Sequence, residues 1–202
     1  GSLTLTLQGS LLPFTAAFQG SGGGPSGPWE TGPRLPAPNF LQGFAHLNGR
    51  LYSLGGSDGG TQHAAVNFSV LGATGVPGPW TATAPLPQPR HSLVAVSALG
   101  RLYAVGGTLV GAGAATNSLY YATPDPIDGS IAGWTSASLP TPLAGLSAVS
   151  FTASGSDLFA IGGHNASGTT LNSVYVSRLD ADTGAPGTWT QLVDMPLTLG
   201  YA

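Results

Sequence analysis

The residues of this 202-residue chain that could carry out chemistry are few and widely scattered. Its four histidines, His46, His63, His91 and His164, do not have the spacing of metal ligands. The absence of cysteine excludes thiolate ligands, disulfides and cysteine nucleophiles. No Gly-x-Ser-x-Gly segment stands at a strand-to-helix turn, and the glycine run at 20–24 lacks the lysine of a phosphate-binding loop. The sequence therefore predicts no catalytic residue, no metal site and no cofactor.

Two pairs of aspartates are the densest acidic groups. Asp125 and Asp128 lie in one segment, and Asp180 and Asp182 lie in a segment of the same kind. The second pair has the beginning of a calcium loop, but Gln191 stands at the twelfth position, where such a loop has glutamate. Aspartate followed by glycine is typical of a tight turn, so we interpret both pairs as turns.

The remaining polar candidates fall in expected loops. Two segments stand out, Arg90-His91 and His164-Asn165, because each joins two polar side chains next to a glycine- or proline-containing turn. Side chains of this kind also serve merely to satisfy backbone groups or to face solvent. The candidate binding residues are Asp58, His63, Arg90, His91, His164 and Asn165.

The elements that must position these residues repeat along the chain. Three segments share one pattern that ends in a glycine pair: 49–56, 100–107 and 156–163. All four tryptophans follow the same period, at intervals of 51, 54 and 55 residues. A glycine precedes each tryptophan closely, and a Leu-Pro or Met-Pro step follows it. Self-similarity at such a period indicates a repeat architecture.

Each repeat contains four predicted strands. In the second repeat these are 92–98, 101–105, 118–123 and 134–137, with period-2 alternation and Gly, Asn or Asp turns between them. Four antiparallel strands in about 50 residues are typical of a β-propeller blade. The uncharged stretch 102–122 is therefore predicted to be two strands and a loop, and not a membrane span.

This pattern resembles the kelch repeat, in the long form found in bacterial-type proteins. The resemblance implies an all-β propeller of four-stranded antiparallel blades, with its partner-binding face at the loops that follow the second and fourth strands. The first repeat departs from the pattern because Asn67 replaces the third-strand tyrosine. The residues that carry the resemblance, for which we expect structural roles, are Gly55, Gly56, Gly106, Gly107, Gly162, Gly163, Tyr120, Tyr175, Trp29, Trp80, Trp134 and Trp189.

The phase of the repeat predicts three complete blades with partial blades at both ends. We expect outer strands of a blade in 1–37, whole blades in 38–88, 89–141 and 142–196, and the start of an inner strand in 197–202. Three arrangements remain open: part of a larger propeller, an oligomer or filament that completes blades between molecules, and a small closed monomer. The uncharged strand-like segment 2–8 could add to a sheet edge, or could pair inside its own blade.

Composition narrows the function. Only 6% of residues are charged, the net charge is −3 and lysine is absent, so a basic surface for nucleic acid is excluded. A surface of Ser, Thr, Gly, Asn and Gln lacks the charge repulsion that keeps proteins apart. We therefore expect a non-enzymatic extracellular or cell-surface module that binds a protein partner or copies of itself. The alternative is a glycan-binding or glycan-processing propeller, since the segment ending at Trp189 is similar to the Asp-box of sialidases.

Overall fold

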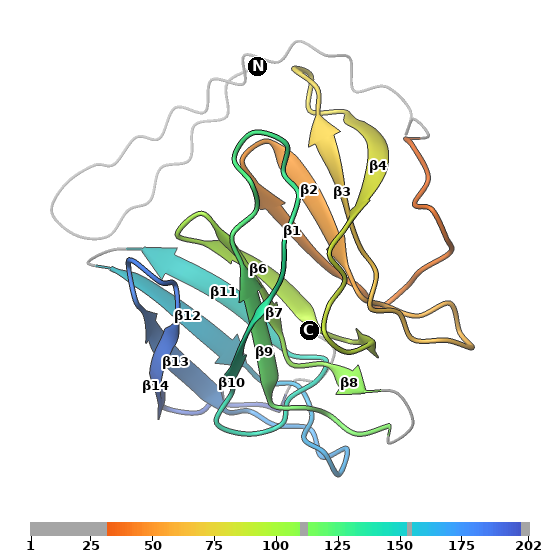
Figure 1. The fold of residues 1–202 in the computed structure, drawn as a ribbon. Helices are drawn as coiled ribbons and strands as arrows, with labels where there is room; N and C mark the ends of the chain where they lie inside the picture. The colour runs from red at the N-terminus through yellow and green to blue at the C-terminus, as the bar shows by residue number, and fades with distance from the viewer. Residues whose placement is uncertain (1–31, 110–112, 153–154, 199–202) are drawn as a thin grey trace, which may run out of the picture. The chain divides into compact units, whose positions relative to one another are not determined.

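The computed structural model describes residues 32–109, 113–152 and 155–198. The chain divides into two units, 1–31 and 32–202, and the architecture below is that of the second. Its described residues form strands and turns without a helix (Figure 1). Accordingly, no helix in this part of the chain is long and apolar enough to cross a membrane. Trp29 and the predicted strand at 2–8 lie outside the described residues.

The strands form three four-stranded antiparallel sheets, one for each full repeat (Figure 1). Sheet 1 contains β1 (Gly43–Leu47), β2 (Arg50–Leu54), β3 (Val66–Leu71) and β4 (Pro77–Thr83). Sheet 2 contains β6 (Val94–Ala98), β7 (Arg101–Val105), β9 (Ser118–Ala122) and β10 (Thr135–Ser138). Sheet 3 contains β11 (Ser147–Thr152), β12 (Ser156–Ile161), β13 (Val174–Leu179) and β14 (Pro186–Gln191). The predicted all-β fold of four-stranded antiparallel sheets is confirmed.

A two-stranded sheet was not predicted from the sequence. It pairs β5 (Arg90–His91) with β8 (Thr108–Leu109), so that His91 lies opposite Thr108. The same pairing occurs as single bridges in the other repeats, between Phe40 and Ser57 and between Ala144 and His164. In each repeat, the pairing between the first two strands of the sheet therefore resumes beyond the glycine pair.

The glycine pairs allow this continuation because the chain turns sharply there. All six of these glycines have positive φ, from 62° at Gly55 and Gly106 to 104° at Gly56 and Gly107. L-residues with a side chain rarely adopt this region. The structural role expected of the six glycines therefore has a direct conformational cause.

The sheets pack face to face in the order of the sequence. One buried cluster joins sheet 1 to sheet 2, with Tyr52 and Leu54 against Leu102 and Ala104. A second joins sheet 2 to sheet 3, with Tyr103 and Val105 on one side and Leu158 and Ala160 on the other. Among the innermost strands, β6 contacts both β1 and β11.

Tryptophans join each sheet to the segment before it. The indole Nε1–H of Trp134 donates to the carbonyl of Ala84 at 3.1 Å, and that of Trp189 donates to Ser138 at 2.9 Å. Trp80 makes the same bond to Pro33 at 3.1 Å. Each acceptor lies four residues after the preceding tryptophan of the repeat. The period of the tryptophans thus reflects one bond repeated at successive sheets.

A second set of bonds runs in the opposite direction along the same seams. Tyr52 Oη donates to the carbonyl of Gly129 at 2.9 Å, and Tyr103 Oη donates to Gly184 at 2.8 Å. The preceding arginine bonds the same loop, because Arg50 donates to Ile127 at 2.6 Å and Arg101 donates to Asp182. We call each of these contacts a seam clasp: the arginine and tyrosine of an Arg-x-Tyr segment donate to carbonyls in the loop between the third and fourth strands of the next sheet.

Replacement of Tyr103 by phenylalanine is expected to lower the free energy of unfolding by about 1–2 kcal/mol, because it leaves the buried Gly184 carbonyl without its donor. Urea denaturation measures the change. Tyr121→Phe is the matched control, since Tyr121 stacks on Tyr103 with ring centroids 5.8 Å apart but lies outside the clasp. Equal losses in the two variants would contradict the clasp.

Candidate functional site

The candidate site lies where the three innermost strands begin, beside the loops that follow the glycine pairs. Leu41, Ser92 and Gly145 occupy equivalent positions there, with φ of 56°, 53° and 56°. Their backbones form a chain of bonds from one sheet to the next: the N–H of Ser92 donates to Leu41 at 2.7 Å, and that of Gly145 donates to Ser92 at 2.9 Å. These bonds hold two non-glycine residues in a rarely populated backbone region.

An open groove of about 220 Å³ follows this line of residues. Leu41, which is 42% exposed, forms part of its wall. The other lining residues are Gln42, Ser92, Leu93, Val94, Gly145 and Leu146. None of these side chains is ionisable, so the groove offers apolar contact and a few hydrogen bonds.

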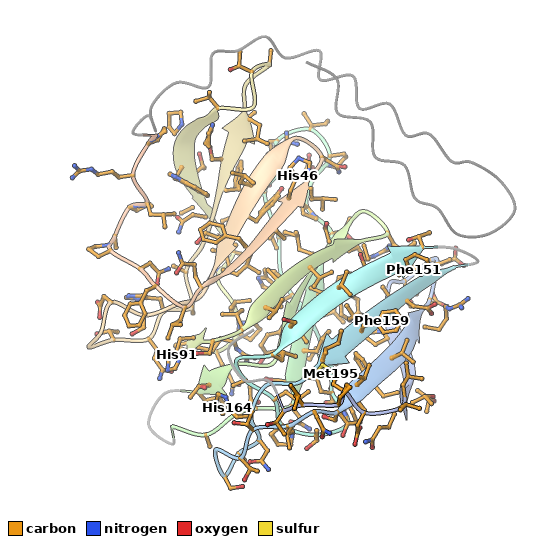
Figure 2. The ribbon with its side chains drawn as sticks, turned by 180° about the vertical axis from the view of Figure 1, so that it is seen from behind. His46, His91, Phe151, Phe159, His164 and Met195 are labelled. Carbon is orange, nitrogen blue, oxygen red and sulfur yellow. The ribbon has the colours of Figure 1, made fainter. Side chains whose placement is uncertain are left out.

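His91 and His164 lie on neighbouring segments at this end of the sheets (Figure 2). His91 Nδ1 is 2.8 Å from the Ser92 hydroxyl. Burial lowers the pKa of His91, and the positive charge that His164 can carry lowers it further. Two of the predicted binding residues are therefore brought together, and the lowered pKa of His91 favours its neutral form, in which one ring nitrogen can accept a hydrogen bond.

The loop after β2 holds Asp58 and His63 together. His63 Nε2 is 3.5 Å from Asp58 Oδ2, while Asp58 Oδ1 accepts the N–H groups of Gly60 and Thr61. These backbone bonds lower the pKa of Asp58, so the carboxylate stays charged in mildly acidic conditions. Ser57 lies beside this pair, but its hydroxyl donates to the Thr61 carbonyl at 3.0 Å. This arrangement serves the turn and leaves Ser57 without the geometry of a nucleophile.

Asn165 makes the corresponding turn in sheet 3. Its Oδ1 accepts from the N–H of Ser167 at 3.0 Å, from the Ser167 hydroxyl at 2.8 Å and from the N–H of Thr169 at 3.0 Å. Asp58 and Asn165 both follow a glycine pair by two residues. The structure thus places these two predicted binding residues in equivalent turns, with one side-chain oxygen occupied by the backbone.

The expectation that Arg90 lies on the loop face is wrong. Its side chain is fully buried, and its Nη1 donates to the carbonyls of Gly106 at 2.9 Å and Ser118 at 3.3 Å. The guanidinium carbon lies 4.6 Å from the centroid of the Tyr120 ring. Burial lowers the pKa of Arg90, which still leaves an arginine charged. Arg90 therefore joins the glycine pair to the third strand of sheet 2 and is not available to a partner.

The aspartate pairs form turns, as the sequence predicts. Asp125 Oδ1 accepts the N–H groups of Ile127 and Asp128, and Asp180 Oδ1 accepts those of Asp182 and Thr183. These bonds lower the pKa of Asp180. Within the residues that the structure describes, no group of three or more His, Asp or Glu side chains could hold a metal ion.

Sequence reasoning missed the most exposed apolar side chains near this site and on sheet 3. Phe40 is 49% exposed beside the groove, Val149 is 51% exposed and Phe151 is 59% exposed. The alternation of β11 resembles that of the buried strands, so nothing in its sequence distinguishes the exposed side chains. One sequence signal does mark this sheet as different. In the aligned repeats, Asp157 and Phe159 stand where the other two repeats have the arginine and the tyrosine of the seam clasp.

Comparison with known proteins supports the fold and does not assign a family. No protein-family model and no curated protein matches this chain. The structure resembles that of YjhT, a β-propeller-like protein, with a TM-score of 0.61 and 18% sequence identity. The match covers 82% of this chain and 54% of YjhT, so the chain spans about half the length of that structure. At this identity the likeness concerns the fold alone.

Proposed function

We propose that the chain is a kelch-like propeller module that acts by binding proteins, including copies of itself, at the cell surface or outside the cell. Its three sheets are then successive blades around the line formed by β1, β6 and β11. The repeated tryptophan bonds and seam clasps support this interpretation, because both join each sheet to the next in the same way. The likeness to YjhT supports the blade arrangement as well.

The observation that carries the binding function is the combination of exposed apolar side chains with a nearly uncharged chain. Phe40 and Leu41 just before β1 and Phe44 within β1 are each more than two-fifths exposed, and Val149 and Phe151 of sheet 3 are more exposed still. With charged residues at 6%, little electrostatic repulsion opposes association. Apolar side chains gathered on particular sheets mark interaction surfaces, whereas isolated ones do not.

The groove counts against the glycan-processing form of the alternative. A glycosidase needs two carboxyl groups about 5–10 Å apart at the scissile bond. The lining residues provide none, and the nearby Asp58 has one oxygen occupied by backbone N–H groups and the other beside His63. The groove therefore does not support a glycan-processing site, and the glycan array below tests glycan binding.

Sedimentation velocity over a concentration series tests the proposal, together with a glycan array run on the same preparation. The expected result is concentration-dependent association and no glycan ligand. A strictly monomeric chain that binds a glycan would overturn the proposed function and support the alternative.

A further inference from the structure

The turn between β1 and β2 holds an asparagine directly before a glycine. Asn48 and Gly49 are both exposed and close this hairpin (Figure 1), with φ of 50° and 71°. The register on either side is fixed, because Leu47 pairs with Arg50. Short hairpin turns favour Asn-Gly, since both of their central residues need positive φ. The same pair also places a side-chain amide next to the backbone nitrogen of a glycine.

The backbone nitrogen of Gly49 is available for reaction. Among the described residues, the N–H of Gly49 donates to no group, whereas its carbonyl accepts the N–H of Leu71 at 2.8 Å. A Cβ built on Gly49 would have no atom within 4 Å, so the space beside this residue is empty. Rotation about ψ of Asn48 brings its side-chain amide to this nitrogen and disturbs the 3.2 Å bond from Arg50 Nη1 to the Asn48 carbonyl.

The other five asparagines lack this arrangement, because each is followed by a residue with a side chain. Asn39 and Asn67 precede phenylalanine, Asn117 and Asn172 precede serine, and Asn165 precedes alanine. Asn39, Asn165 and Asn172 also hold their side-chain amides in hydrogen bonds. A side chain on the following residue hinders the approach of that residue's nitrogen. The chemistry available to Asn48 is therefore specific to this turn.

We propose that Asn48 is a site of spontaneous deamidation. The backbone nitrogen of Gly49 loses its proton and attacks Cγ of Asn48, the Cγ–Nδ2 bond breaks, and ammonia leaves a cyclic imide. Water then opens the imide. Cleavage of the new bond to Cγ gives aspartate, and cleavage of the original peptide bond gives isoaspartate, in which the main chain runs through Cβ and Cγ. The reaction needs only water, and it is independent of the binding function proposed above.

Isoaspartate lengthens the main chain of the turn by one methylene group. The pairing of Leu47 with Arg50 then has to change, and Arg50 is the residue that donates to the Ile127 carbonyl in the first seam clasp. Either product also adds one negative charge to a chain whose net charge is −3. In the second repeat, Leu99 and Gly100 make the same turn, with φ of 50° and 69°, and cannot react. The modification is therefore expected to weaken the seam between sheets 1 and 2 alone.

Mass spectrometry of peptides tests the proposal after incubation of the chain in warm, mildly alkaline buffer, with fragmentation to assign each conversion to a residue. Asn48 is expected to convert to the acid about tenfold faster than any other asparagine, which corresponds to an activation barrier lower by about 1.4 kcal/mol. Asn48→Leu is the matched control, because leucine occupies this turn position in the second repeat, and its turn is expected to stay unmodified. Conversion at Asn48 no faster than at Asn117 would overturn the inference.

Urea denaturation of fresh and incubated samples separates the longer main chain from the added charge. Freshly prepared Asn48→Asp carries the charge on an unaltered backbone, so its free energy of unfolding is expected to stay close to that of the parent. The incubated parent is expected to unfold at lower urea, and incubated Asn48→Leu is expected to keep its midpoint. A parent that contains isoaspartate and unfolds as the fresh protein does would overturn the effect on the first seam clasp.

Discussion

Replacement of Gly106 by alanine is expected to lower the free energy of unfolding by about 2–5 kcal/mol. Gly106 has a φ of 62°, a region that costs an L-residue about 1–2 kcal/mol. An added Cβ would also lie 2.2 Å from the backbone carbonyl oxygen of Leu143, a residue with no exposed surface. That oxygen already accepts the N–H of Gly107 at 2.9 Å, so it cannot move away without breaking the bond between sheets. Overpacking at such a contact costs about 1–3 kcal/mol more.

Gly100→Ala is the matched control for Gly106→Ala. Gly100 has a φ of 69° and no heavy atom within 4 Å of an added Cβ, so it carries the conformational cost alone. Urea denaturation of the two variants therefore isolates the contact with Leu143. Equal losses in both would show that the close approach of sheets 2 and 3 at Gly106 does not constrain the fold.

The strands were predictable because their boundaries depend on local signals. The predicted strand 101–105 is β7, since a turn at Gly100 and the pair Gly106-Gly107 limit it on both sides. The predicted strand 92–98 begins two residues later, at Val94, because Ser92 adopts positive φ to bond the neighbouring repeats. That bond depends on tertiary contacts, and serine carries no sequence signal for it.

The candidate site was less predictable, because exposure depends on what surrounds a residue. Asp58 lies in an expected loop, whereas His91 belongs to β5, a short strand that was not predicted and that pairs with β8. Asn39, at the position of Arg90 in the preceding repeat, shows why the burial of Arg90 was not predicted. Its Nδ2 donates to the carbonyl of Gly55 at 2.7 Å, and Arg90 donates to the equivalent carbonyl of Gly106. Two unlike side chains satisfy one backbone requirement, so no residue pattern marks the position. A charged residue in a loop is normally exposed, which is the rule that failed here.

Replacement of Arg90 by alanine is the second large effect, with an expected loss of about 3–5 kcal/mol in the free energy of unfolding. The substitution removes a fully buried side chain, leaves a cavity above Tyr120, and takes the donor from the carbonyls of Gly106 and Ser118. Arg90→Lys keeps the charge and part of the hydrogen bonding, so its loss is expected to be smaller than that of Arg90→Ala.

Arg34→Ala controls for the loss of one arginine, since Arg34 is exposed and its removal is expected to change stability by less than about 0.5 kcal/mol. Urea denaturation at a single pH measures all three variants. A loss in Arg90→Ala no larger than that in Arg34→Ala would contradict the buried role and return Arg90 to the surface candidates. The expected order has a structural reason. The Arg90 side chain holds the Gly106 carbonyl, the neighbouring Gly107 N–H donates to Leu143, and the Arg90 backbone carbonyl accepts the N–H of Gly56, so loss of the side chain disturbs the point where the repeats meet.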